Sequence, residues 1–188
     1  MGLTRPQATR LVRAGFAGPA IRTAGSVLYD GHLVQALVDW PRVDELELTG
    51  ACPRELFVAR LGPTRGLDLL SPRPEQLEAA GRSWDLSPWT RLLLQLRVGQ
   101  HGSVPFVATV CGYVGVGADI TALALDRGPV PEEPPTDGSS SIGCSGDREL
   151  VRLELGDPGE WFETLRGRRF CTGRGGPWIL WDRRRHLR

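Results

Sequence analysis

The sequence predicts an α+β protein in which a small helix–hairpin–helix unit precedes a mixed domain with an antiparallel sheet and a few helices. Three observations carry this prediction. Two helical segments flank a hairpin signal within the first 40 residues, a strongly helical stretch follows Ser87, and a β-branched stretch runs from Val104 to Leu125. The 188 residues, 40% of them apolar and 24% charged, are typical of a folded globular chain.

The first helix is marked at both ends. Thr4 and Gln7 fit a capping box, Pro6 stands in the first turn, and Gly15 is placed to end the helix. The segments Ala20 to Thr23 and Ser26 to Tyr29 can then pair as a short hairpin. Asp30 is expected to cap a second helix that ends before Pro41, with this core face: Leu33, Val34, Leu37, Val38.

The next part of the chain alternates strands and helices. Leu46 to Thr49 is expected to be a short strand, and Glu55 to Leu61 a half-buried one. A short helix is predicted near Glu75 to Ala80. A longer helix is predicted from Ser87 through Val98, with Gly99 ending it. Its apolar residues follow helical spacing and predict a face packed on the sheet: Trp89, Leu92, Leu93, Leu96.

The last part is expected to complete the sheet. Val104 to Leu125 predicts two strands that meet near Gly112 to Gly117. Residues 128–147 have the composition of a flexible loop. Leu150 to Leu155 predicts a strand, Asp157-Pro158 a cap for a short helix through Leu165, and GPWILWD a final strand.

Charge is distributed unevenly along the chain. Residues 1–42 carry a net charge of +3, residues 43–165 of −9 and residues 166–188 of +7, and all 23 basic residues are Arg. The basic ends therefore favour an anionic partner, or they pair with the acidic middle of the same chain. The C-terminal run interleaves arginines with Phe170, Trp178 and Trp181. We expect the two tryptophans to belong to the core and leave both roles open for the arginines.

The sequence offers no clear catalytic, metal or cofactor site. The four cysteines and three histidines lack the close spacing of metal ligands. GYVGVGAD lacks the last glycine of a dinucleotide fingerprint and fits a hairpin better. Glu132 and Glu133 stand in a Pro-rich loop, where paired carboxylates are usually solvated. We therefore expect a protein that is not an enzyme and needs no cofactor.

No apolar run is long enough to span a membrane, and Met1 to Ala20 lacks the features of a signal peptide. These observations predict a cytoplasmic protein with no membrane partner.

One stretch resembles a known family. The pattern RTxGxxxYxxxxVxxL, which includes Arg22, Thr23, Gly25 and Tyr29, resembles the wing and third helix of MerR-type and excisionase-like winged helix-turn-helix domains. The preceding TRPQATRLVRAGFAGPAI occupies the place of the recognition helix in that family. The resemblance covers residues 1–42 and divides the chain into a winged-helix-like head, 1–42, and an α+β domain, 43–188.

The resemblance implies DNA contacts. It implies that the helix from Arg5 to Ala14 enters the major groove and that Arg22 contacts the DNA backbone from the wing. These residues are the candidate DNA contacts: Gln7, Arg10, Arg13, Arg22, Thr23, Tyr29. The family's domain begins with a further helix, whereas three residues precede Thr4 here. We expect that helix to come from later in the chain or from a partner subunit, or the unit to serve as a docking module.

The function that the sequence favours is a DNA-binding or transcription-associated regulator whose larger domain mediates dimerisation, ligand sensing or docking. A homodimer would strengthen the weak contact of a small head by effective concentration. The alternative is a protein-interaction or structural component that binds a protein partner and no nucleic acid. An enzyme with a pocket in the β-rich domain is a third hypothesis, for which no nucleophile or base can be named.

Overall fold

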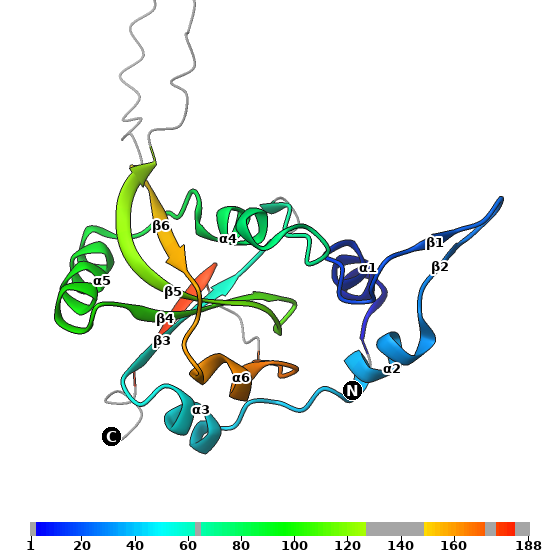
Figure 1. Ribbon diagram of the computed structural model, residues 1–188, viewed down its shortest axis with the longest axis horizontal. Coiled ribbons are helices and arrows are strands. Elements are labelled where there is room, and N and C mark those ends of the chain that lie inside the picture. Colours follow the sequence, from blue (N-terminus) through cyan, green and yellow to red (C-terminus); the bar gives the residue numbers. More distant parts are fainter. Residues whose placement is uncertain (1–2, 63–64, 127–148, 172–175, 183–188) are drawn as a thin grey trace, which may run out of the picture.

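A computed structural model describes residues 3–62, 65–126, 149–171 and 176–182. In this part of the chain a five-stranded sheet has the order β6-β5-β4-β3-β7, and a separate two-stranded hairpin projects from one end of the molecule (Figure 1). The α+β class predicted from the sequence is confirmed. The predicted flexible loop at 128–147 lies outside the described residues.

The elements follow the chain in the predicted order with one change of type. The helices are α1 (Arg5–Arg13), α2 (Gly31–Asp39), α3 (Glu45–Ala51), α4 (Arg73–Gly81), α5 (Pro88–His101) and α6 (Trp161–Leu165). The strands are β1 (Ile21–Arg22), β2 (Val27–Leu28), β3 (Glu55–Arg60), β4 (Val104–Val110), β5 (Tyr113–Asp126), β6 (Leu150–Gly156) and β7 (Trp178–Asp182). The sheet is mixed and not wholly antiparallel as predicted, because β3 and β4 run parallel while its other neighbouring strands pair antiparallel.

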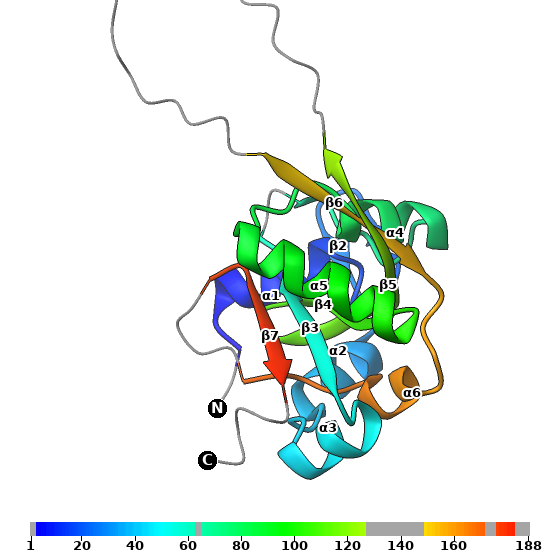
Figure 2. The ribbon, with the colours of Figure 1, turned by 90° about the vertical axis from the view of Figure 1, so that its left-hand side faces the viewer.

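The interior strand β3 is buried on both faces, so the prediction of a half-buried strand was wrong. Phe57 and Ala59 face a core that α4, α5 and the N-terminal unit cover. Leu56 and Val58 face a second core against α3 and α6, which lie together on the other side of the sheet (Figures 1 and 2). Parallel pairs usually need such cover on both faces, and their strands then lose the alternating pattern that indicates half-burial.

The helix α3 replaces the short strand predicted at Leu46 to Thr49. Asp44 Oδ1 accepts a hydrogen bond from Glu47 N at 2.7 Å, and the Glu47 carboxylate accepts one from Asp44 N. This capping box begins a helix whose inward residue is Leu48, while Leu46 is exposed. The alternation of apolar and polar residues from Leu46 to Thr49 favoured a strand. The capping box just before this segment starts a helix there instead.

The apolar face predicted for α5 points outward. Leu94 is fully buried, whereas Leu92 and Leu96 are 47% and 53% exposed and Trp89 is exposed as well. The inward side of the helix includes Arg97, whose Nε lies 3.1 Å from Oε2 of the buried Glu55 at the start of β3. A buried carboxylate without a partner is strongly destabilising, so this pair favours the observed rotation of the helix.

The helix α2 also buries less than its sequence predicts. Asp30 accepts hydrogen bonds from His32 N and Leu33 N and so caps the helix as expected. Of the four predicted core residues only Leu37 is buried, and the other three are each at least 40% exposed: Leu33, Val34, Val38. The hairpin projects away from α2 in Figure 1, and these side chains stay partly exposed, although Leu33 lies close to Gly18.

The N-terminal unit is joined to the sheet by an aromatic cluster. The ring centroids of Phe16 and Trp40 are 5.9 Å apart, and those of Trp40 and Tyr113 are 5.7 Å apart. Leu11 and Leu37 pack into the same core as the sheet residues. Residues 1–42 and the sheet therefore share buried apolar surface.

Two glycines are required by the packing. Gly15 ends α1, as predicted, with φ +83°. Gly117 in β5 lies under the ring of Phe162, and a Cβ there would fall 2.1 Å from Phe162 Cδ2. The small residues of GYVGVGAD thus allow α6 to approach the sheet, which agrees with the hairpin interpretation of this segment.

The orientation of α5 can be tested by truncating leucines on its two sides. Leu94→Ala should lower the free energy of unfolding by about 2 to 5 kcal/mol, because it leaves a cavity in the core. Leu92→Ala and Leu96→Ala should each change it by about 0.5 kcal/mol or less. Urea unfolding followed by circular dichroism measures the difference, and equal losses at Leu92 and Leu94 would contradict the observed face.

Candidate functional site

The helix α1 presents an exposed basic side and buries the opposite side. Arg5, Thr9 and Arg13 recur at intervals of four residues and are exposed, while Leu11 is buried against the sheet. The predicted contact residue Gln7 is already engaged, since its Oε1 accepts hydrogen bonds from Thr4 N and Thr4 Oγ1, each at 3.0 Å. Sequence reasoning did not select Arg5, whose exposure completes this basic row.

Arg10 and Arg13 lie at the border between α1 and the sheet. They line a cavity of about 120 Å³ together with Gly62, Gly66 and Val110. Arg10 also lies beside Cys111. Burial raises the pKa of the Cys111 thiol, and the nearby guanidinium acts in the opposite direction. Arg10 therefore has a contact within the protein, and both Arg10 and Arg13 are exposed.

The other three predicted contacts belong to the hairpin and the entry to α2. Arg22 is exposed in β1, and the Thr23 hydroxyl donates to Ser26 O at 3.1 Å across the turn. Tyr29 is half-buried just before α2. The hairpin extends away from α1 in Figure 1, so the arginines of α1 and Arg22 lie on separate parts of one protruding unit.

The arginines of α1 and the hairpin have no carboxylate partner among the described residues, a property that they share with Arg54 and Arg82. Arg5, Arg10, Arg13 and Arg22 form no ion pair with any described carboxylate. In contrast, six arginines elsewhere pair with carboxylates at 2.7 to 3.9 Å: Arg73, Arg91, Arg97, Arg152, Arg166, Arg168. Positive charge is thus left without a nearby carboxylate where α1 and the hairpin meet solvent.

The C-terminal basic run is partly neutralised within the protein. Arg168 Nη2 lies 2.7 Å from Glu47 Oε1 in α3, and Arg166 pairs with Glu163 at 2.8 Å. Trp178 and Trp181 pack in or against the two cores, as expected, and Phe170 packs against the second core as well. The arginines from Arg183 onward lie outside the described residues.

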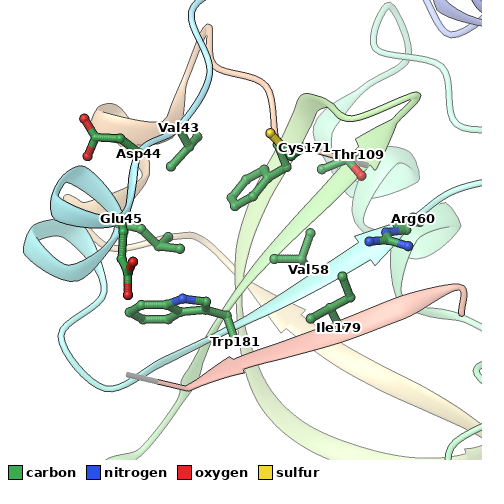
Figure 3. A pocket seen from close by; sticks show the side chains of 11 residues that line it. Val43, Asp44, Glu45, Val58, Arg60, Thr109, Cys171, Ile179 and Trp181 are labelled. Atoms are coloured by element: carbon green, nitrogen blue, oxygen red, sulfur yellow. The ribbon is translucent and has the colours of Figure 1, made fainter. Parts of the chain in front are cut away.

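A pocket of about 360 Å³ opens on the face of the sheet that α3 covers (Figure 3). Its floor comes from three strands: Val58, Arg60, Thr109, Ile179, Trp181. Its walls come from the start of α3 and from the segment after Arg168: Val43, Asp44, Glu45, Leu48, Phe170, Cys171. Because these residues come from five separate segments, no local sequence pattern indicated the pocket.

Backbone pairing holds the Phe170 wall of the pocket in place. Phe170 N donates to Gly112 O at 2.8 Å, and Arg169 O accepts from Val43 N at 3.0 Å. The Arg168–Glu47 ion pair fixes the same segment to α3. On the floor, the buried hydroxyl of Thr109 donates to Ala59 O at 2.9 Å, so it is satisfied within the sheet.

The cysteines carry no evident metal or nucleophilic site. Cys52, Cys111 and Cys171 are free thiols, and Cys144 is not among the described residues. Burial, with a further contribution from Asp119, raises the pKa of the Cys52 thiol to about 12. Such a thiol stays protonated at neutral pH. The described segments contain no group of three or more His, Cys, Asp or Glu side chains arranged to hold a metal ion.

Comparison with known protein families, with curated proteins and with solved structures finds no match for this chain. The resemblance to winged helix-turn-helix domains therefore rests on the residues that carry it and remains a hypothesis. Among the described helices, none has the length and apolar character needed to cross a membrane.

The raised pKa of Cys52 predicts how stability changes with pH. Unfolding restores an ordinary thiol pKa near 9, whereas the folded protein keeps the proton up to about pH 12. The unfolded chain thus binds fewer protons between these values, and stability should fall as the pH rises, by at most about 1.4 kcal/mol per pH unit. Urea unfolding between pH 8 and 11 should show a shallower fall for Cys52→Ala. The exposed Cys171→Ala variant is the control, and identical slopes in Cys52→Ala and the parent would contradict the assignment.

Proposed function

We propose that this protein is a DNA-binding regulator in which α1 and the β1–β2 hairpin contact the phosphate backbone. The observation that carries the proposal is the set of N-terminal arginines without a carboxylate partner among the described residues: Arg5, Arg10, Arg13, Arg22. Guanidinium groups that lack an internal counter-charge can exchange solvent for phosphate without breaking an ion pair.

The order of the elements supports the same proposal. The capped helix α1, the projecting hairpin and α2 follow one another as do the recognition helix, wing and third helix in the family that the sequence resembles. The exposed row of Arg5, Thr9 and Arg13 gives α1 a polar side to present to DNA. Gln7 is held in the helix cap, so the arginines are better candidates for contact than Gln7.

The proposal is tested by fluorescence anisotropy with a random-sequence duplex at two salt concentrations. The full chain should bind with a Kd that rises with salt, since phosphate contacts release counterions. The variant Arg5→Ala/Arg13→Ala/Arg22→Ala should bind more weakly, and each lost contact should reduce the salt slope by about one. This variant leaves Arg10 beside Cys111 and so preserves the attachment of α1.

A charge-matched control separates a specific surface from overall charge. Arg54→Ala/Arg82→Ala/Arg152→Ala removes three exposed arginines from the rest of the molecule. It should leave the Kd and the salt slope close to those of the full chain. Equal loss in both triple variants, or no binding by the full chain at low salt, would refute the proposed DNA surface.

A second candidate function is self-association without nucleic acid, and a specific observation favours it. Exposed aliphatic side chains cover the hairpin and α2: Ile21, Val27, Leu28, Leu33, Val34, Val38. No Arg, Asp or Glu lies between Gly31 and Val38. The α2 part of this surface on a second copy of this chain could therefore pack against it about a twofold axis without like-charge repulsion.

Sedimentation velocity distinguishes this candidate. If α2 forms the contact, the full chain should dimerise at micromolar concentration, and Val34→Gln/Val38→Gln should shift it to monomer. The variant Leu92→Gln/Leu96→Gln alters the other exposed apolar helix face, on α5, and should leave the dimer intact. A monomer at every concentration, or a dimer lost only in the α5 variant, would exclude α2 as the interface.

A further inference from the structure

The pocket between α3 and the sheet has the size and lining of a small-molecule site. Its volume of about 360 Å³ falls within the range of about 300 to 1,000 Å³ that such sites occupy. Leu48, Val58 and Trp181 line the pocket and are almost fully buried, because they also pack in the second core. The apolar lining of the pocket is therefore fixed by core packing. Figure 3 shows Val58 and Ile179 near the middle of the cavity, and Phe170 belongs to its lining as well.

Charge is placed unequally at the two ends of this pocket. Arg60 is the single basic residue among the described lining residues, and it lies at the carboxyl end of β3 opposite Thr109 of β4. Glu45 lies toward the other end, where its side chain points to Trp181 in Figure 3, while Asp44 points away from the cavity. Asp44 is also engaged as the cap of α3.

This arrangement limits the ligands that fit. The apolar middle favours a ring or a branched hydrocarbon body, because Phe170 and Trp181 offer aromatic surface. The guanidinium of Arg60 has several N–H donors, so it can bind a carboxylate or sulfonate in addition to its contacts within the protein, one of which is to Gly176 O at 3.5 Å. Glu45 would repel a second negative charge at the far end.

We propose that this pocket binds a small ring-containing monoanion, with its acidic group at Arg60 and its apolar body between Phe170 and Trp181. The site uses none of the residues assigned to DNA contact. It therefore extends the proposed function by giving the larger domain a ligand of defined chemical class, and it does not require the N-terminal unit to bind DNA.

Two fluorescent probes with the same aromatic skeleton test the proposal. The first is 8-anilinonaphthalene-1-sulfonate, a monoanion, and the second is N-phenyl-1-naphthylamine, which lacks the sulfonate. In titrations of the full chain at pH 7, the sulfonate probe should bind saturably at one site and at least about tenfold more tightly than the uncharged probe, because it adds a charge-assisted contact. Equal affinity for both probes would overturn the role of Arg60.

Two independent variants locate the binding. Arg60→Gln should weaken the sulfonate probe about tenfold and leave the uncharged probe unchanged. Ile179→Trp should abolish the site for both probes by filling it, and a larger side chain is tolerated there because Ile179 is 41% exposed. Circular dichroism verifies that each variant is folded.

A third variant tests for adsorption of the probes elsewhere. Leu92→Gln/Leu96→Gln removes exposed apolar surface from α5 and should not change the affinity of either probe. Loss of binding in this variant, or binding that persists unchanged in Ile179→Trp, would show that the probes occupy another surface and would refute the proposed site. DNA binding is measured separately, so failure of the pocket proposal leaves the DNA proposal unaffected.

Discussion

The parallel pair β3–β4 must be covered on both faces, and the arrangement of the other elements follows from this requirement. The two strands lie inside the sheet, and their residues alternate between two cores. Parallel neighbours also need a long connection, which α4 and α5 provide on one face. The other face is covered by α3, from before β3, and by α6, from after β6. Segments far apart in sequence therefore meet around one strand pair, and the pocket lies where this second cover is incomplete.

The N-terminal unit contributes to the first of these covers. Phe16 and Trp40 contact Tyr113 at the start of β5, and Leu11 belongs to the core of the sheet. Because the apolar side of α1 is used in this packing, its basic side is held toward solvent. The exposed aliphatic residues of α2 and the hairpin have no such partner among the described segments. The unit thus combines a basic surface that is fixed by packing with an apolar surface that is partly exposed. The basic surface supports the proposed DNA binding, and the apolar surface supports the proposed self-association.

Elements whose signals lie within a few residues could be predicted from the sequence. The caps of α1 and α2, the hairpin and the turn between β4 and β5 are of this kind, since each depends on neighbouring side chains or on a glycine. The rotation of α5 could not be predicted, because it depends on an ion pair between Arg97 and the distant Glu55. The pocket could not be predicted either, since Arg60, Phe170 and Trp181 meet only through the fold.

The backbone at Arg169 joins the two candidate sites. Arg169 N donates to Pro41 O, and Arg169 O accepts from Val43 N, beside the Trp40 that anchors the N-terminal unit. The next residue, Phe170, forms the wall of the pocket. If occupancy of the pocket shifts this segment, the change reaches the attachment of the unit through these two hydrogen bonds. If both proposed sites are occupied as proposed, thermodynamic linkage then requires reciprocity: the factor by which the ligand changes the affinity for DNA is the factor by which DNA changes the affinity for the ligand.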